Sequence, residues 1–330
     1  MATDVLDLSG DGLHTMDGIA LPDTLTELCL MHNRIRVIEK LEPLTALQKL
    51  NLRANRIEKL GGLSTCIGLT ELELYENQLQ KIEGLEGLQR LTLLDLSFNE
   101  ITRIEALEGA GLVALKSLYL ANNRIECIEG LRGLPSLELL ELGSNSIRRV
   151  DNLAEVPTLT ELHLGRNKIR SLEDGGATGL CSLTKLRVLG VASNRLRSLD
   201  GVQRLTKLQE LYADHNGIES CDALSGLTQL HTLDLGANRV QTFDACSNLT
   251  LLEELWLSDN AIQTAADLSP LRKLPCLQTI RLSGCPIAAT PDYVDAVRQH
   301  APASLTQLDA DPIGAGAAGG RGAAAGAVST

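Results

Sequence analysis

A repeated asparagine constrains this chain more than any other feature. The pattern Leu-x-x-Leu-x-Leu-x-x-Asn-x-Ile/Leu begins at Leu25, and most successive asparagines are 22 residues apart. Asp11 takes the slot before the first asparagine, and Cys285 takes the last slot. A fixed period of this length predicts a solenoid whose first and last turns are atypical. The asparagines of the pattern are Asn33, Asn55, Asn77, Asn99, Asn123, Asn145, Asn167, Asn194, Asn216, Asn238 and Asn260.

The residues around each asparagine predict how one turn folds. Each Leu-x-Leu segment forms a short strand, and the strands stack in parallel about 4.8 Å apart. Their leucines point inward, and because only 2% of residues are aromatic the core must be aliphatic. The asparagine amide can satisfy backbone groups that the bend after the strand buries. Segments such as "IEGLEGL" return along the convex side as extended chain or single 3₁₀ turns.

This pattern resembles the leucine-rich repeat, in its short 22-residue class, over roughly residues 3 to 310. The resemblance implies an α/β repeat fold, a solenoid of about 12–13 repeats with a parallel β-sheet on its concave face. Longer steps at "EGAG", "EDGGATG" and "AADLSPLRKL" predict two loops and a helical turn outside the strands. The expected units are an N-terminal capping repeat (1–24), the repeats (25–284), a C-terminal cap with a helix from Pro291 to His300 (285–310), and a disordered Gly/Ala-rich tail (311–330).

Composition and charge restrict the classes of partner. The formal net charge of −12 argues against binding to the phosphate backbone of nucleic acids and favours a basic protein surface. The eight cysteines occur singly without a C-x-x-C pair, which indicates reduced intracellular thiols. The N-terminus lacks the features of a signal peptide, and no apolar run approaches the length of a membrane span. We expect no membrane or nucleic-acid partner, and a monomer when the chain is alone.

Motifs of catalysis are missing from the sequence. It contains no H-E-x-x-H, P-loop, G-x-S-x-G or kinase signature, and its six histidines are scattered. We therefore expect a protein that is not an enzyme and that holds no cofactor and no metal. Solenoids of this kind are typically binding platforms, because their concave face offers many independently variable positions.

The register predicts which side chains line the concave face. Within the pattern these are the third, fifth and seventh positions, and the fifth lies between two buried leucines. Trp256, the only tryptophan, lies between Leu255 and Leu257 and must point outward for them to be buried. None of the residues in the fifth-position row is aliphatic: Cys29, Asn51, Glu73, Asp95, Tyr119, Glu141, His163, Gly190, Tyr212, Asp234, Trp256 and Arg281.

Acidic and aromatic side chains are enriched on this face. At the third, fifth and seventh positions of the repeats the only bases are Lys49, Arg53 and Arg281. The same positions hold ten acids: Glu27, Glu71, Glu73, Asp95, Glu141, Glu161, Glu210, Asp214, Asp234 and Glu254. Tyr75, Tyr119, Tyr212 and Trp256 also lie there, and exposed Trp and Tyr are the residue types most enriched in binding hot spots. Phe243 and Phe98 are expected to be packed, Phe243 in the core.

The strings "LDLSFN", "LELGSN", "LYADHNGIE" and "EELWLSDN" resemble the protein phosphatase 1 regulatory subunit 7 family. That resemblance implies a non-catalytic nuclear and cytoplasmic protein that binds the protein phosphatase 1 catalytic subunit through acidic and aromatic concave residues. Carried over by position, Asp95, Tyr119, Glu141, Asp234, Glu254 and Trp256 match the family in kind, and Tyr212 lies in the same row. His163 and Arg281 depart from it, because the family has an aromatic residue and a tyrosine there.

Two other classes of leucine-rich repeat protein compete with this interpretation. One is a structural scaffold of cilia, axonemes or another intracellular assembly, which shares the repeat and the cap. The other is a spliceosomal subunit that binds a small RNA-binding domain, and such proteins are usually shorter. The scaffold class is not expected to show the order Asp, aromatic, Glu found at 95, 119 and 141, and the spliceosomal class fits the acidic face less specifically.

Overall fold

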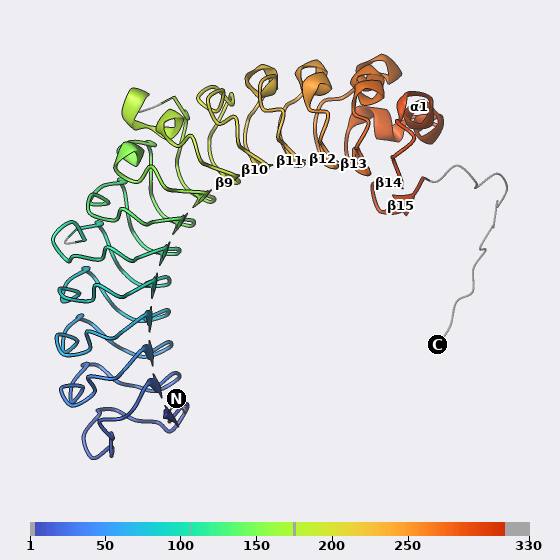
Figure 1. The fold of residues 1–330 in the computed structure, drawn as a ribbon. Helices are drawn as coiled ribbons and strands as arrows, with labels where there is room; N and C mark the ends of the chain where they lie inside the picture. The colour runs from blue at the N-terminus through green and yellow to red at the C-terminus, as the bar shows by residue number, and fades with distance from the viewer. Residues whose placement is uncertain (1–3, 106, 174–175, 314–330) are drawn as a thin grey trace, which may run out of the picture.

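The chain winds into an arc whose inner side is one continuous β-sheet (Figure 1). The computed structural model describes residues 4–105, 107–173 and 176–313. The 15 strands within these residues follow one another in sequence order, so each turn contacts the turn before and the turn after it. The pairing is parallel except at the last pair, β14–β15, which is antiparallel. The predicted leucine-rich repeat solenoid with a concave parallel sheet is confirmed.

Most strands contain three residues and recur in step with the sequence period. Their bounds are β1 Val5–Asp7, β2 Glu27–Cys29, β3 Lys49–Asn51, β4 Glu71–Glu73, β5 Leu93–Asp95, β6 Ser117–Tyr119, β7 Leu139–Glu141, β8 Glu161–His163, β9 Val188–Gly190, β10 Glu210–Tyr212, β11 Thr232–Asp234, β12 Glu254–Trp256, β13 Thr279–Arg281, β14 Gln307–Leu308 and β15 Asp311–Pro312.

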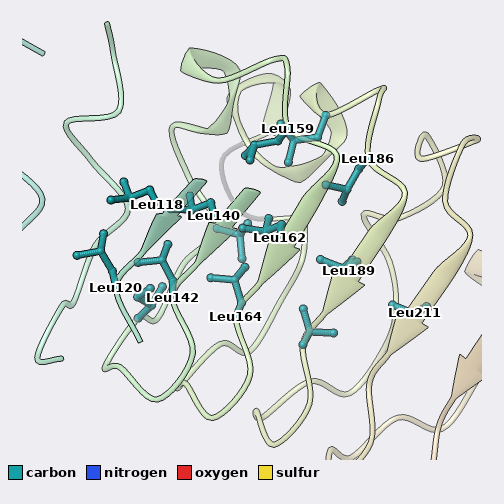
Figure 2. Close-up of a cluster of buried hydrophobic side chains, with 14 of the residues drawn as sticks. Leu118, Leu120, Leu140, Leu142, Leu159, Leu162, Leu164, Leu186, Leu189 and Leu211 are labelled. Carbon is teal, nitrogen blue, oxygen red and sulfur yellow. The ribbon is translucent and has the colours of Figure 1, made fainter. Parts of the chain in front are cut away.

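The core is a continuous column of aliphatic side chains behind this sheet. In each strand from β2 to β13 the middle residue is buried, and the residue directly after the strand, a leucine in most repeats, is buried beside it. Figure 2 shows this arrangement for Leu118 and Leu120, Leu140 and Leu142, and Leu162 and Leu164. Further leucines and isoleucines from the convex segments close the column from the other side. Phe243 is fully buried in it, as expected. The column buries aliphatic surface along the full length of the arc, which is the main source of its stability.

The asparagines form a hydrogen-bonded ladder at the bend after each strand. Asn55 shows the arrangement: its Nδ2 donates to the carbonyls of Leu30 (2.9 Å) and Leu52 (3.1 Å), and its Oδ1 accepts from the Ile35 N–H (3.0 Å). The residue before each asparagine, such as Ala54 with φ 52°, adopts the left-handed conformation that non-glycine residues rarely adopt. At the last slot the Cys285 thiol donates to the Leu257 carbonyl at 3.1 Å. The ladder therefore holds an unfavourable backbone bend in register.

The convex side changes character along the chain. Turns connect the strands up to β7, and 3₁₀ helices appear in most later steps. The long step predicted at "EDGGATG" contains two of these helices, and residues 174–175 of that loop lie outside the described residues. The bounds are η1 Leu153–Glu155, η2 Gly176–Thr178, η3 Leu180–Ser182, η4 Asp222–Leu224, η5 Asp244–Asn248, η6 Ala265–Lys273 and η7 Pro286–Ala289.

A short helix and two strands cover the C-terminal end of the core. Helix α1 (Tyr293–His300) packs against η6 and buries Val297. It begins two residues later than the predicted start at Pro291, because the Tyr293 N–H closes a turn onto the Thr290 carbonyl first. The Tyr293 hydroxyl donates to Asp309 Oδ2 at 2.8 Å, so this tyrosine is part of the cap, as expected. Strand β15 falls inside the expected tail, and residues 314–330 lie outside the described part of the chain.

Candidate functional site

The concave row predicted from the sequence exists as a row of neighbouring side chains. In β5 to β8 the pairing places Asp95 beside Tyr119, Tyr119 beside Glu141, and Glu141 beside His163. In β10 to β13 it places Tyr212, Asp234, Trp256 and Arg281 in the same succession. All except the exposed Arg281 are partly buried, because the neighbouring strands cover their flanks. Glu254 lies two residues before Trp256 on the same face. Their role in binding a partner stays a prediction.

Trp256 is covered rather than freely exposed. The guanidinium carbon of Arg281 lies 4.6 Å from the centre of the indole ring, which is a cation–π arrangement. The indole Nε1 is buried and has no hydrogen-bond partner among the described residues. Arg281 can cover the ring because it occupies the matching position of the next strand, β13. The ring points away from the core onto the concave face, as expected, and Arg281 covers it there.

Tyr212 is held by the acid two residues before it. Its hydroxyl donates to Glu210 Oε2 at 2.8 Å. Burial, reinforced by this hydrogen bond and by the nearby carboxylates, raises the pKa of Tyr212 to about 12. The ring therefore stays neutral at physiological pH and offers an apolar surface with a fixed polar tip, which suits a contact residue.

A hollow of about 450 Å³ interrupts the row between β7 and β10, and Glu141, His163 and Tyr212 are among the residues that line it. Small residues form much of its floor, including Gly143 and Gly165 at the seventh positions. A Cβ atom on Gly190 would lie only 3.0 Å from His163 Nδ1, so glycine gives the imidazole room. The hollow can receive a side chain that projects from a partner.

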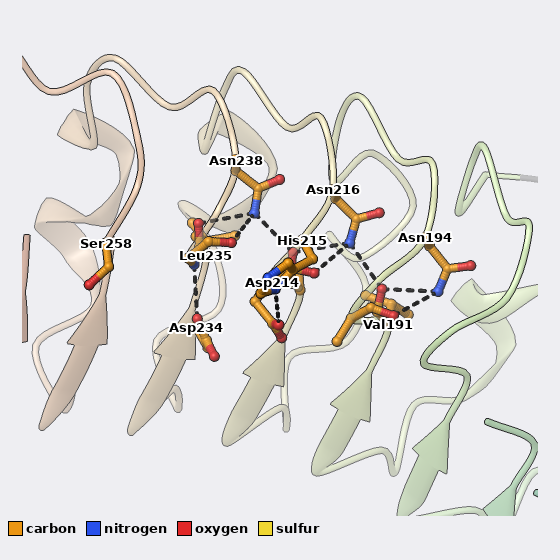
Figure 3. A network of polar contacts seen from close by, with 12 residues as sticks. Val191, Asn194, Asp214, His215, Asn216, Asp234, Leu235, Asn238 and Ser258 are labelled. Carbon is orange, nitrogen blue, oxygen red and sulfur yellow. Dashed lines mark hydrogen bonds and ion pairs between the residues drawn. The ribbon is translucent and has the colours of Figure 1, made fainter. Parts of the chain in front are cut away.

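Two acids around this region are partly desolvated. Burial raises the pKa of Glu141, although the Gly143 N–H and the nearby His163 act in the opposite direction. Burial likewise raises the pKa of Asp234, whose Oδ1 accepts the Gly236 N–H at 2.9 Å (Figure 3). These carboxylates are fixed by backbone donors and not by Lys or Arg side chains. A basic group from outside the chain would therefore find them pre-oriented.

Sequence reasoning missed a second set of concave side chains. The eighth position of the pattern, just before each ladder asparagine, projects from the left-handed bend. There Phe98 is 43% exposed, so the expectation that it is packed holds only for one face, which lies 4.6 Å from the Tyr75 ring centre. His215 occupies the same position and its Nδ1 lies 2.7 Å from Asp214 Oδ2. Their fixed place directly before each ladder asparagine is the sequence signal that could have identified them.

The described residues offer no evidence of other chemistry. They contain no group of three or more His, Cys, Asp or Glu side chains placed to hold a metal ion. Within the same residues, no helix is both long enough and apolar enough to cross a membrane. All eight cysteines are free.

Comparisons with known proteins agree with the architecture. Solved structures similar to this one include the internalin InlF from Listeria monocytogenes, with a TM-score of 0.80 and 23% identity over 93% of this chain and 86% of that one. A leucine-rich repeat protein from Leptospira interrogans has a TM-score of 0.65 and 23% identity over 92% of this chain and 94% of that one. At these identities the likeness concerns the fold alone. A search of curated proteins found no match.

Family comparisons identify the repeats themselves. The "Leucine rich repeat" family matches residues 89–147 and 156–218. The "Leucine Rich repeats (2 copies)" family matches residues 23–65, 67–109 and 206–250. Neither is an enzyme family, and such repeats are generally scaffolds for protein interaction. Together the matches cover well over half of the chain, which belongs to the leucine-rich repeat family.

Proposed function

We propose that this chain is a non-catalytic regulatory subunit that binds the protein phosphatase 1 catalytic subunit with its concave face. One observation carries the proposal. From β5 to β12 the concave acids make no ion pair with a Lys or Arg among the described residues, and they alternate with Tyr119, Tyr212 and Trp256. An acidic, aromatic surface of this kind is complementary to a basic protein surface.

The size of the row supports a folded protein as the partner. Asp95 in β5 and Arg281 in β13 are eight strand steps apart, which is about 38 Å at the usual strand spacing. A peptide or small molecule would contact only part of that length. The resemblance of the concave strings to the phosphatase regulatory family supplies the identity of the partner, and with it a nuclear and cytoplasmic location.

Trp256 is the proposed anchor, and Arg281 is its cover. When the partner binds, Arg281 moves off the ring, and a carbonyl of the partner accepts the unpaired indole N–H. The binding energy then includes a hydrogen bond that the free protein lacks, in addition to the buried ring surface.

The test is calorimetric titration of the purified catalytic subunit into this chain and into two double variants. Glu254→Ala with Trp256→Ala removes the proposed anchor and its neighbouring acid. Glu71→Ala with Tyr75→Ala is the matched control, because it removes an acid and an aromatic residue from β4 and the residues after it. We expect the first pair to weaken binding by about 2 kcal/mol or more, and the control to change it little.

Full binding by the Glu254→Ala/Trp256→Ala protein, with an unchanged melting temperature, would contradict the proposal. Mass spectrometry of proteins captured from native extract tests the identity of the partner separately. Recovery of axonemal proteins without the phosphatase would leave the concave face as a binding surface and exclude the proposed partner.

A further inference from the structure

Five basic side chains gather on one edge of this acidic protein, at the bend that follows β7, β8 and β9. Lys168 and Arg195 come directly after ladder asparagines, and the other three lie two residues further along. Three of them line a surface hollow of about 520 Å³, namely Arg170, Arg195 and Arg197. We name the whole set the basic edge: Arg148, Lys168, Arg170, Arg195 and Arg197.

The basic edge differs from the equivalent positions of the repeats on either side of it. Before it, Arg124 pairs with Glu100 across one repeat at 3.3 Å, and after it Arg239 pairs with Glu219 at 3.8 Å. Within the basic edge the described residues show no ion pair to a carboxylate, and Lys168 Nζ only donates to Ser146 Oγ at 2.9 Å. Ion pairs therefore flank the basic edge on both sides, whereas within it three successive repeats carry basic side chains at these positions.

Stacking like charges at matching positions of neighbouring strands or turns costs stability. Arg148, Arg170 and Arg197 occupy the same position of three successive repeats, and Glu126 and Glu219 occupy it on either side. The side chains are exposed, so water and salt reduce the repulsion without removing it. The energetic cost is relieved when an anion binds between them.

We propose that the basic edge binds a phosphorylated side chain of a protein partner. Three guanidinium groups that line one hollow are best satisfied by a ligand with about two negative charges and three acceptor oxygens, which is a phosphate monoester. One carboxylate supplies a single charge and two oxygens. The planar guanidinium of arginine is also suited to bidentate contacts with phosphate.

The position of the hollow favours a phosphoprotein over a nucleic acid. A nucleic acid carries a phosphate at every nucleotide and needs a long basic track, whereas the basic edge covers three repeats and is bounded by acids. The net charge of −12 opposes an extended polyanion as well. The basic edge shares no residue with the concave row. The proposal of a phosphate site therefore does not depend on whether the phosphatase binds the concave face.

The experiment uses the full chain labelled with ¹⁵N and a degenerate pool of phosphoserine peptides, with the same pool unphosphorylated as reference. We expect the arginine Nε–Hε signals of the hollow to shift with the phosphorylated pool only. The triple variant Arg170→Gln/Arg195→Gln/Arg197→Gln should bind this pool at least roughly tenfold more weakly. The matched variant is Arg34→Gln/Arg36→Gln/Arg56→Gln. These arginines lie one or three residues after two successive ladder asparagines, and the fourth position of that set is the acid Glu58. This variant should bind like the parent chain.

Four results would overturn the proposal. Equal binding of the two peptide pools would show that phosphate is not recognised, and retained binding by the triple variant would place the site elsewhere. Competition by inorganic phosphate at the same concentration as the pool would indicate a free-anion site. Tighter binding of a single-stranded oligonucleotide would indicate a nucleic-acid site. Melting curves check folding, and the triple variant should be no less stable, because it relieves repulsion between like charges.

Discussion

The concave faces of the N-terminal and C-terminal repeats share one backbone register and differ in how their charges are balanced. In the repeats that contain β3 and β4, Lys49 pairs with Glu71 at 3.0 Å and Arg53 pairs with Glu73 at 3.4 Å. From β7 to β12 the acids have only backbone, hydroxyl or imidazole partners, or none among the described residues. In this solenoid, the positions that determine the fold are therefore different from the positions that are available for binding. Its core positions repeat, while its concave positions vary without disturbing the core.

The largest effects should be the same in both regions, because the core is the same. Leu72→Ala in β4 and Leu233→Ala in β11 each remove a fully buried side chain from the middle of a strand. We expect each change to lower the free energy of unfolding by about 3 kcal/mol, through lost burial and the cavity that remains. Urea denaturation measures both.

Two probes show whether the regions unfold together. Far-UV circular dichroism follows the whole chain, whereas Trp256 fluorescence follows the C-terminal repeats, since it is the only tryptophan. Coincident curves for both variants mean one cooperative unit. If Leu72→Ala shifts the dichroism curve and leaves the fluorescence curve in place, the two regions are independent folding units and the shared-core comparison fails.

The asparagine ladder should show the next largest effect, again alike in the two regions. Asn77→Ala and Asn238→Ala each leave a buried N–H, that of Ile57 or Ile218, without its acceptor, and carbonyls without their donor. We expect a loss of about 2 kcal/mol in each case, measured by urea denaturation. Cys285→Ala, at the end of the ladder, removes a single weak thiol bond and serves as the control with a small effect. A loss for Cys285→Ala as large as for the asparagines would disprove the stated role of the amide.

The repeat period determines which features of the fold and of the concave row could be predicted from the sequence. Burial of leucine, the strand register and the asparagine ladder depend on the period alone, so the sheet and its concave row were predictable. The row of Asp95, Tyr119 and Glu141 needed only the alternation of strand side chains.

Features that depend on contacts between repeats were not predictable in this way. The cover that Arg281 places on Trp256 requires two side chains from neighbouring strands to meet, and the sequence does not fix their rotamers. The basic edge lies outside the concave positions, although its arginines occur at fixed distances from the ladder asparagines. The late start of α1 depends on a local turn at Thr290, where the sequence pattern alone favoured Pro291.

The two regions should respond differently to pH. Burial raises the pKa values of Glu141 and Asp234, so the folded state binds their protons more tightly than the unfolded state does. The stability of the chain therefore falls as the pH rises from the ordinary pKa values, 4.5 for Glu141 and 3.8 for Asp234, through the raised pKa values of the folded state. The destabilisation by the two charged carboxylates persists at neutral pH. Glu141→Gln with Asp234→Asn should raise the urea midpoint at neutral pH, by less than the asparagine variants lower it.

That stabilisation should shrink as the pH falls toward the ordinary values of the two carboxyl groups, because the parent chain then carries the protons itself. Glu71→Gln is the control from the paired region. It removes the carboxylate that binds Lys49 and should destabilise the chain slightly at neutral pH. An equal response of the three positions would mean that the two regions do not differ in charge balance.

The smallest effects come from exchanging the charge arrangements of the two regions. Lys49→Ala removes a surface ion pair and should cost about 0.5 kcal/mol at neutral pH. Because Glu71 raises the pKa of Lys49, that stabilisation is present below the ordinary lysine value of 10.5 and disappears as the pH rises through the folded value.

Thr232→Lys makes the reciprocal change, since Thr232 lies between Glu210 and Glu254 in the sheet. It should add about 0.5 kcal/mol of stability at low salt and weaken binding of a basic partner. A gain in stability without any loss of binding would show that the free acids of the C-terminal repeats are not what the partner recognises.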